Sequence, residues 1–341
     1  MKSINNLENL SPDLYLRYHY GFEIIKNLQK SKPCHILDVG GRSGIMGDFI
    51  KKENLPYTLT IIDSLPDDKS KTTVCDKYIQ KDLLKFETTT KFNYLVTFDV
   101  LEHVNDKKLF INKCLSLCDS LILSAPFKSD ITDIAENIVD QYFLKYKGVH
   151  HPWLKEHFKQ GLPEITWLKD LLNSHKITFE ALESNNIENW VNFMLPNLLP
   201  ALYTVDTKKL DEINQYYNQN FQDLGDTTFP TYRKIFVTLP KSTKSIPNEF
   251  IHQNSKINIQ KKIIFINLVI DFLTNNIKLE KENNILKDTI INEKLKLEKE
   301  IKTTKLEIDN YTKLIDQIIN SKFYKIWQLF CNCKKYLTNE N

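Results

Sequence analysis

Short runs of hydrophobic residues alternate with helix-length amphipathic segments through the first two thirds of the chain. Each run has the length and composition of a buried β-strand. The runs are residues 34–40, 58–63, 77–80, 92–100, 120–127, 177–184 and 233–240. Strands that are separated by helix-sized segments are typical of βαβ units. The pattern therefore predicts an α/β fold, with a mostly parallel sheet that helices cover on both faces.

Two segments between these strands are long enough to form insertions over one edge of the sheet. They cover residues 128–170 and 185–232, and both contain stretches with helical periodicity. Residues 241–250 are polar and are interrupted by Pro247, as expected of a linker. We therefore expect one α/β domain over residues 1–245, with both insertions acting as lids.

The pattern changes to a heptad repeat in the C-terminal part. Seven of the nine core positions of this repeat are hydrophobic, and Lys and Glu fill most flanking positions. The core positions are Ile290, Lys294, Leu297, Ile301, Thr304, Ile308, Tyr311, Ile315 and Ile318. The repeat predicts a helical extension over residues 246–341 with a coiled coil at about 279–319. Such a coiled coil would form a homo-oligomer or bind a partner helix, whereas the alternative is one long helix packed on the domain.

Composition narrows the class of protein. The chain has 341 residues, 41% of them hydrophobic, and a formal net charge of only +3 without a long basic block, so nucleic acid is not expected as a partner. The longest apolar run, residues 263–273, is too short to cross a bilayer. The six cysteines lack the spacing of zinc sites or of a disulfide framework. These features predict a cytoplasmic protein.

The most specific motif is the sequence HILDVGGRSG at residues 35–44. A buried strand ends near Asp38, and a glycine-rich turn leads into a helix that is expected to begin near Ile45. Glycines allow the backbone to turn tightly and to approach a ligand closely. The dinucleotide pattern G-x-G-x-x-G is not present, because Arg42 occupies one of its glycine positions. This difference argues against a nicotinamide-dependent oxidoreductase.

The motif resembles the first motif of class I S-adenosylmethionine-dependent methyltransferases, an acidic residue followed by G-x-G-x-G. Asp38, Gly40 and Gly44 match, Gly41 lies one position early, and Arg42 replaces the middle glycine. The sequence FDVLEHV at residues 98–104 also resembles the fourth motif of the type-11 branch of this family. The resemblance implies a Rossmann-like sheet of seven strands with the last antiparallel, and S-adenosylmethionine as cofactor.

The resemblance also implies roles for residues at the ends of later strands. Asp63 would accept hydrogen bonds from the ribose hydroxyls. Asp82 would meet the adenine amino group with Leu83 alongside the ring, and Phe98 and Asp99 would lie beside the methionine end. Considered without the family, Asp63 also fits a turn before a proline, and Asp82 fits a helix N-cap.

A metal site is a further possibility at the fourth motif. In some relatives, including ubiquinone-biosynthesis O-methyltransferases, an acidic residue followed by x-x-E-H holds a divalent metal. Asp99, Glu102 and His103 fit that spacing. The favoured interpretation is that Glu102 caps a helix while His103 packs beneath a lid, so we assign no metal.

A histidine-rich segment, GVHHPWLKEHFKQGLP at residues 148–163, follows the fifth strand, where the family builds its acceptor site. His150 and His151, together with His103, are candidates for the base that removes a proton from the acceptor. His157 and Trp153 belong to the same segment. The alternative is that these side chains form the packed underside of a lid.

The histidine-rich segment at residues 148–163 and the C-terminal coiled-coil extension together resemble small-molecule methyltransferases found beside bacterial glycosyltransferases. The resemblance implies a small-molecule or glycan acceptor that is methylated on a hydroxyl oxygen. The alternative function is an inactive methyltransferase-like scaffold that assembles partners through its coiled coil. Residues 321–330 resemble the amphipathic ends of tails on glycan enzymes, where a peripheral membrane contact is an alternative to an ordinary buried helix.

Overall fold

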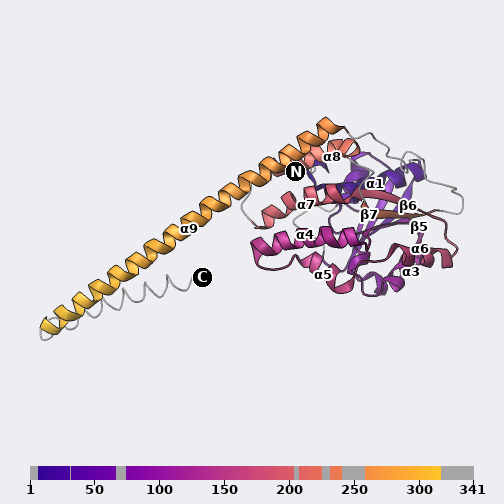
Figure 1. The fold of residues 1–341 in the computed structure, drawn as a ribbon. Coiled ribbons are helices and arrows are strands. Elements are labelled where there is room, and N and C mark those ends of the chain that lie inside the picture. Colours follow the sequence, from indigo (N-terminus) through magenta and orange to yellow (C-terminus); the bar gives the residue numbers. More distant parts are fainter. Residues whose placement is uncertain are drawn as a thin grey trace. The chain divides into compact units, whose positions relative to one another are not determined.

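A computed structural model describes residues 7–30, 32–66, 74–202, 207–224, 231–239 and 258–315 (Figure 1). The chain divides into two compact units, Met1–Thr274 and Asn275–Asn341. The first contains the sheet and every predicted site residue. The second contains the C-terminal part of the longest helix.

The first unit is built on a seven-stranded sheet in the order β3-β2-β1-β4-β5-β7-β6. The strands are β1 Cys34–Val39, β2 Tyr57–Asp63, β3 Lys77–Gln80, β4 Phe92–Phe98, β5 Cys118–Pro126, β6 Phe179–Asn186 and β7 Thr231–Thr238. Strand β7 is antiparallel to β5 and β6, and the other neighbouring strands are parallel. This arrangement confirms the predicted Rossmann-like sheet of seven strands with the last antiparallel.

The two final strands are displaced by two residues from their predicted positions. The hydrophobic run at 177–184 predicts an earlier start for β6, but the backbone first turns after α6, where Lys176 has a φ of +55°. Irregular pairing of β6 with β7 then extends β6 to Asn186. Strand β7 begins at Thr231 because its pairing with β6 continues past the hydrophobic run.

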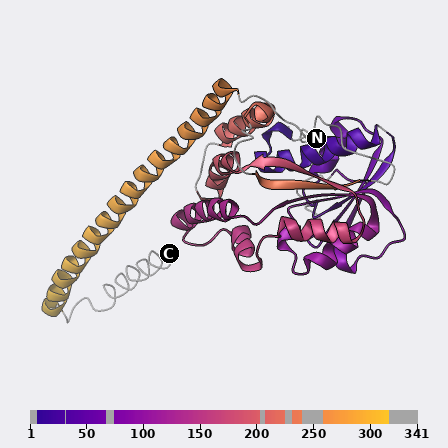
Figure 2. The same cartoon turned by 45° about the vertical axis from the view of Figure 1, so that its right-hand side comes forward.

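Helices cover both faces of the sheet (Figure 2). The α-helices of the described chain are α1 Pro12–Gln29, α2 Ile45–Lys52, α3 Lys107–Leu117, α4 Asp130–Lys147, α5 Pro152–Gln160, α6 Ile165–Ser174, α7 Ile187–Leu202, α8 Thr207–Leu224 and α9 Ile259–Ile315. Three short 3-10 turns are η1 Leu7–Asn9, η2 Leu83–Lys85 and η3 Leu101–His103. Consecutive residues of β1 point to opposite faces of the sheet and belong to different hydrophobic cores. Ile36 belongs to the core that includes α1, α2, α7 and α8, and Leu37 belongs to the core that includes α3 and α6. The predicted insertions are thus helical.

Helix α4 is fixed at both ends by local sequence. The Ser129 hydroxyl accepts a hydrogen bond from the Thr132 N–H at 3.1 Å, and Asp130 and Asp133 lie in the first turn, where the helix dipole favours negative charge. Gly148 ends the helix in the left-handed conformation. These caps position two buried acidic residues of α4, Glu136 and Asp140, which lie one turn apart.

The first turns of α9 belong to the core of the first unit. Phe265, Val269 and Phe272 are buried there, and the Phe265 ring lies 5.1 Å from that of Tyr217. Lys261 forms a 2.7 Å ion pair with Asp223. The hydrophobic core therefore continues beyond residue 245, although the polar segment 241–250 predicts a boundary there.

We expect a chain that ends at Thr274 to retain the stability of the first unit, and a chain that ends at Lys244 to lose several kcal/mol. Removal of residues 259–274 deletes these three side chains, and the burial of each contributes about 1.5–3 kcal/mol. Urea unfolding of both truncated chains measures the difference. Equal unfolding midpoints would contradict this assignment of the helix to the core.

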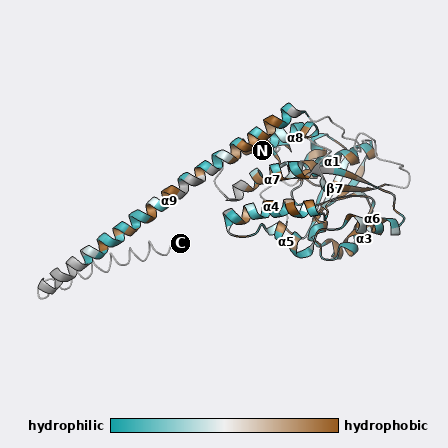
Figure 3. Cartoon of the chain, in the orientation of Figure 1, coloured by the Kyte–Doolittle hydropathy of each residue, from teal (hydrophilic) through white to brown (hydrophobic). Residues whose placement is uncertain are grey.

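In the second unit, helix α9 continues to Ile315 and carries hydrophobic residues among charged ones (Figure 3). The heptad positions Ile290, Leu297 and Ile301 are 61%, 56% and 41% exposed. Helicity agrees with the repeat, while the coiled coil stays a prediction. The last heptad position, Ile318, and the segment 321–330 lie outside the described residues. Within the described ranges, no helix combines the length and hydropathy needed to cross a membrane.

Candidate functional site

The carboxyl end of β1 combines a buried acid with a turn that excludes side chains. Asp38 is fully buried, and neither of its carboxylate oxygens has a hydrogen-bond partner among the described residues. A Cβ on Gly41 would lie 2.1 Å from the Asp38 carboxylate, and one on Gly40 would lie 2.5 Å from a methyl group of Val100. Gly40 also has a φ of +78°. Glycine is therefore required in this turn by space and by conformation.

The residue that departs from the family pattern has its own structural role. The Nε of Arg42 donates a hydrogen bond to the carbonyl oxygen of Pro66 at 2.9 Å, which ties the turn to the loop after β2. Gly44 then adopts a φ of +69° at the start of α2, as the predicted strand–turn–helix requires. The N-terminus of α2, with its unpaired N–H groups, thus opens beside the turn.

Burial of Asp38 has a consequence for stability. Desolvation, together with the nearby charge of Asp63, raises the pKa of Asp38 from 3.8 to about 8. Between these values the folded state binds more protons than the unfolded state. The stability of the ligand-free protein should therefore fall as pH rises from about 4 to about 8, by up to about 1.4 kcal/mol per pH unit from this group.

Asp38→Asn is expected to remove this dependence and to stabilise the ligand-free protein above pH 8. Urea unfolding across the pH range measures the effect, with exposed Asp119→Asn as the control. A wild-type pH profile in Asp38→Asn would show that Asp38 has an ordinary pKa in the fold.

The next two predicted acids lie along the same edge of the sheet. Asp63 ends β2, and its Oδ1 accepts a hydrogen bond from the Leu65 N–H at 2.8 Å. Asp82 follows β3 and caps η2, because its Oδ1 accepts from the Leu84 N–H at 2.9 Å. Leu83, the first residue of η2, is buried in the core. Both turn interpretations of the aspartates are thus correct locally, and each carboxylate has a second oxygen for a ligand.

The two predicted site residues at the end of β4 have contacts with other elements of the fold. The Phe98 ring lies in the core, edge-on to Tyr18 at 5.0 Å and against Gly21 of α1. Asp99 has a φ of +54° and is ion-paired with Arg17 and Arg233, with 2.7 Å between its Oδ1 and the Arg233 Nε. The side chain of Phe98 thus contributes to packing, and the Asp99 carboxylate is held by two arginines.

Arg233 also pairs with Asp13 of α1 and so links that residue to Asp99. Its guanidinium lies 2.6 Å from Asp13 and is almost fully buried. Although burial raises the pKa of Asp13, the charges of Arg233 and Arg17 outweigh it and lower that pKa. This buried network fixes α1 against the carboxyl edge of the sheet.

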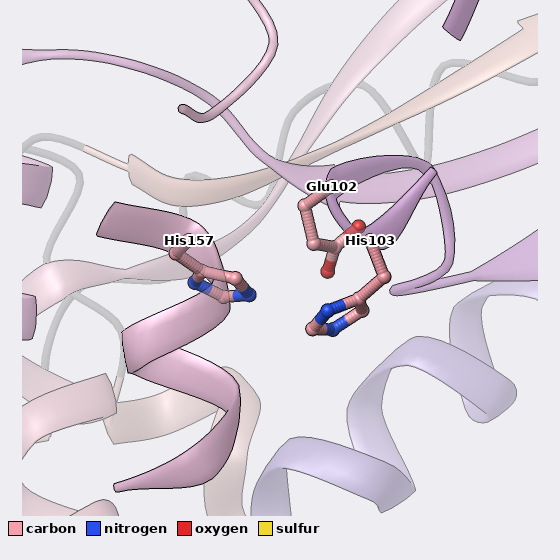
Figure 4. Close-up of side chains that lie close together, drawn as sticks. All are labelled: Glu102, His103 and His157. Atoms are coloured by element: carbon pink, nitrogen blue, oxygen red, sulfur yellow. The ribbon is translucent and has the colours of Figure 1, made fainter. Parts of the chain in front are cut away.

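The η3 turn and helix α5 bring Glu102, His103 and His157 together (Figure 4). One ligand atom from each lies within 4.8 Å of the others. Glu102 is 1% exposed and His157 is 7% exposed, whereas the His103 side chain is 27% exposed. The Oε2 of Glu102 and the Nε2 of His157 lack hydrogen-bond partners among the described residues. Two elements far apart in sequence thus bring these three side chains together, and two of the three have a buried polar atom without a partner among the described residues.

Acidic residues orient the histidines. The Nδ1 of His157 lies 2.9 Å from Glu136, which also accepts a hydrogen bond from the Tyr232 hydroxyl at 2.8 Å. The Nδ1 of His103 lies 2.7 Å from Glu156. The sequence indicated the segment that contains His157, but only the packing of α5 against η3 pairs it with Glu102.

The other two predicted bases belong to a different group. The Nδ1 of His150 lies 2.6 Å from Asp140, which also accepts from the His151 backbone N–H at 2.9 Å. His151 is buried edge-on to Phe143 and Trp153. Of the three candidates for a base, the structure thus places only His103 in the cluster on η3.

Burial favours the uncharged forms of Glu102 and His103. It raises the pKa of Glu102 well above its ordinary value, and the charge of Asp99 adds to this effect. Burial and the neighbouring His157 lower the pKa of His103, although Glu156 opposes the shift. Near neutral pH, His103 is therefore mostly unprotonated, with a nitrogen that can accept a proton or bind a metal.

The segments that follow the cluster residues along the chain line an open groove. It is lined by residues 105–108 and 160–164 and by Trp167, and its volume is about 630 Å³. Lys107, Lys108 and Trp167 give it basic and aromatic groups. Such a groove suits a polar ligand with flat rings or hydroxyls.

No protein-family model matches the chain. No curated protein matches its sequence. Among solved structures, it is similar to the plantazolicin methyltransferase BpumL in complex with SAH, at 13% identity and a TM-score of 0.44, with 69% of this chain and 88% of that chain covered. It is also similar to the magnesium protoporphyrin IX methyltransferase from Synechocystis, at 11% identity and a TM-score of 0.38, with 66% of this chain and 85% of that chain covered. A function for this chain therefore depends on its own site.

Proposed function

We propose that the chain binds S-adenosylmethionine and transfers its methyl group to a hydroxyl oxygen of a small-molecule or glycan acceptor. The observation that carries the proposal is the unpartnered, buried Asp38 beside a turn that admits only glycine. Strand order reverses between β1 and β4, and open α/β sheets bind ligands at such a switch point.

The edge of the sheet offers acceptors to a ligand rich in hydrogen-bond donors. Asp63 ends the strand next to β1 and would accept from a ribose, and Asp82 follows the strand beyond it. The Gly40–Gly41 turn leaves the backbone bare for close approach. These features match an adenosyl ligand with a cationic end, and bound S-adenosylmethionine supplies an activated methyl group.

The chain's own task is mainly alignment. The acceptor oxygen must lie in line with the methyl carbon and the sulfur, so that the carbon–oxygen bond forms as the carbon–sulfur bond breaks. The acceptor hydroxyl also loses its proton. We assign this step to the cluster of Glu102 and His103, which follow β4, and His157 of α5.

An inactive scaffold is the alternative function. It would have no need for Asp38, a fully buried carboxyl group without a partner that destabilises the ligand-free fold above neutral pH. Calorimetry of the full chain with S-adenosylmethionine and with NAD tests both interpretations. We expect one equivalent of S-adenosylmethionine and no NAD to bind, whereas binding of neither would support the scaffold.

We also propose that residues 279–319 form the coiled coil that the heptads predict. The large exposed fractions of Ile290 and Leu297 support an unsatisfied hydrophobic seam. We expect the full chain to self-associate and a chain ending at Thr274 to be monomeric, as measured by sedimentation. If both have the same number of subunits in solution, the exposed seam has another role.

A further inference from the structure

The cluster at η3 has the donors of a metal site. Its carboxylate and two imidazoles converge from η3 and α5, as Figure 4 shows, and the atoms that lack partners belong to its two buried members. Buried polar atoms in native structures are nearly always hydrogen-bonded. Unpaired atoms on two neighbouring side chains, as found among the described residues, therefore indicate a bound species that satisfies both.

The hydrogen bonds around the cluster fix the tautomers of its two histidines. A carboxylate only accepts hydrogen bonds, so Glu136 selects the tautomer of His157 with its proton on Nδ1. Glu156 selects the same tautomer of His103. In the unprotonated form of each ring, the lone pair is then on Nε2. A carboxylate that holds the outer nitrogen of a histidine is the usual outer-shell arrangement around metal ions.

We propose that Glu102, His103 and His157 bind a divalent transition-metal ion. Tetrahedral ligands at 2.0–2.1 Å from an ion lie about 3.4 Å from one another, so side-chain movements of the order of 1 Å bring donors now within 4.8 Å into range. Asp99, which the x-x-E-H spacing suggests as a ligand, is instead neutralised by Arg17 and Arg233. His157, from the lid segment, takes its place.

The donor set selects the class of ion. Two imidazoles and one carboxylate suit Zn²⁺, Fe²⁺ or Co²⁺, whereas Mg²⁺ prefers oxygen ligands alone. Three protein ligands leave a position open, as in catalytic metal sites, and His103 is partly exposed. The role of the ion rests on the proposed function: a cation next to the acceptor hydroxyl lowers the pKa of that hydroxyl.

The test measures Zn²⁺ binding by the chelator-treated full chain. We expect wild type to bind one more equivalent than Glu102→Gln or His157→Gln, because each change removes a ligand. Zn²⁺ ions that bind to cysteine thiols elsewhere contribute equally to wild type and variant, so they do not affect the difference between the two stoichiometries. Glu136→Gln should weaken this ion by about 10–100-fold through loss of the outer-shell contact. The control His175→Asn, in which the replaced imidazole lies 2.9 Å from the Asn112 side chain and belongs to no part of the cluster, should bind as wild type.

Thermal unfolding provides a readout that is independent of activity. Glu102→Gln is nearly isosteric and removes a buried, unpaired carboxyl group, so it should fold and be at least as stable as the metal-free wild type. Zn²⁺ should raise the unfolding temperature of wild type more than that of Glu102→Gln. Equal Zn²⁺ stoichiometry and equal stabilisation in the two proteins would overturn the proposal, as would tight Mg²⁺ binding in place of Zn²⁺.

Titration with S-adenosylmethionine separates this proposal from the proposed function. We expect all of these variants to bind the cofactor as wild type does, since Asp38, Asp63 and the glycine turn are unchanged. Loss of the Zn²⁺ difference with intact cofactor binding would refute only the metal site. A full chain that binds Zn²⁺ through Glu102 but no S-adenosylmethionine would refute the proposed function alone.

Discussion

Gly40→Ala is expected to weaken S-adenosylmethionine binding by about 5–150-fold. The new Cβ would lie 2.5 Å from the Val100 side chain, so the loops after β1 and β4 must move apart. Forcing extra volume into a packed site costs about 1–3 kcal/mol, and here that cost falls on the crevice. Calorimetric titration of the variant measures the loss of affinity.

Gly148→Ala is a matched control for this experiment. Gly148 has a φ of +73°, close to the +78° of Gly40, but a Cβ there would meet no atom within 4 Å. Both variants thus carry the same conformational strain of about 1–2 kcal/mol, and only Gly40→Ala adds a collision beside the site. Equal cofactor affinities in the two variants would mean that the turn after β1 does not contact the ligand.

Asp63→Ala should weaken S-adenosylmethionine binding by a similar factor of about 5–150. Loss of a hydrogen bond between a charged acceptor and the ribose hydroxyls costs about 1–3 kcal/mol. Asp63→Asn separates this effect from the local turn, because an amide oxygen can still accept from the Leu65 N–H. We expect Asp63→Asn to bind more weakly than wild type and to keep wild-type stability.

Calorimetry of the two Asp63 variants checks this assignment. An Asp63→Ala protein with wild-type cofactor affinity would show that the carboxylate only stabilises the turn before Pro66. The hydrogen bond from the Leu65 N–H to Asp63 would then account for the carboxylate, and the cofactor would not bind at the end of β2.

Local sequence predicts the parts of the fold that depend on local interactions. The sequence runs locate all seven strands, and the signal is strongest for the central strands β1, β4 and β5, because a strand covered on both faces needs a continuous apolar segment. The glycines at 40 and 44 mark positions with positive φ, where only glycine avoids strain. Asp38 follows from the same motif, since the acid stands at the end of the strand that the turn interrupts.

Tertiary contacts decide the parts that sequence does not predict. The pairing of His157 with Glu102 depends on how α5 packs against η3, and no spacing along the chain encodes it. The ion pairs of Asp99 depend on Arg17 from α1 and Arg233 from β7. Likewise, the polar segment 241–250 predicts a domain end, but Phe265 and Phe272 return to the core after it.

A crystal structure of the full chain grown with S-adenosylmethionine tests the central claim most directly. We expect the adenosyl group to lie against the Gly40–Gly41 turn, with the ribose hydroxyls within hydrogen-bond distance of Asp63 and the methyl group directed toward the cluster on η3. Electron density for the ligand at another place, or a crevice between β1 and β4 filled by the protein's own side chains, would contradict the account.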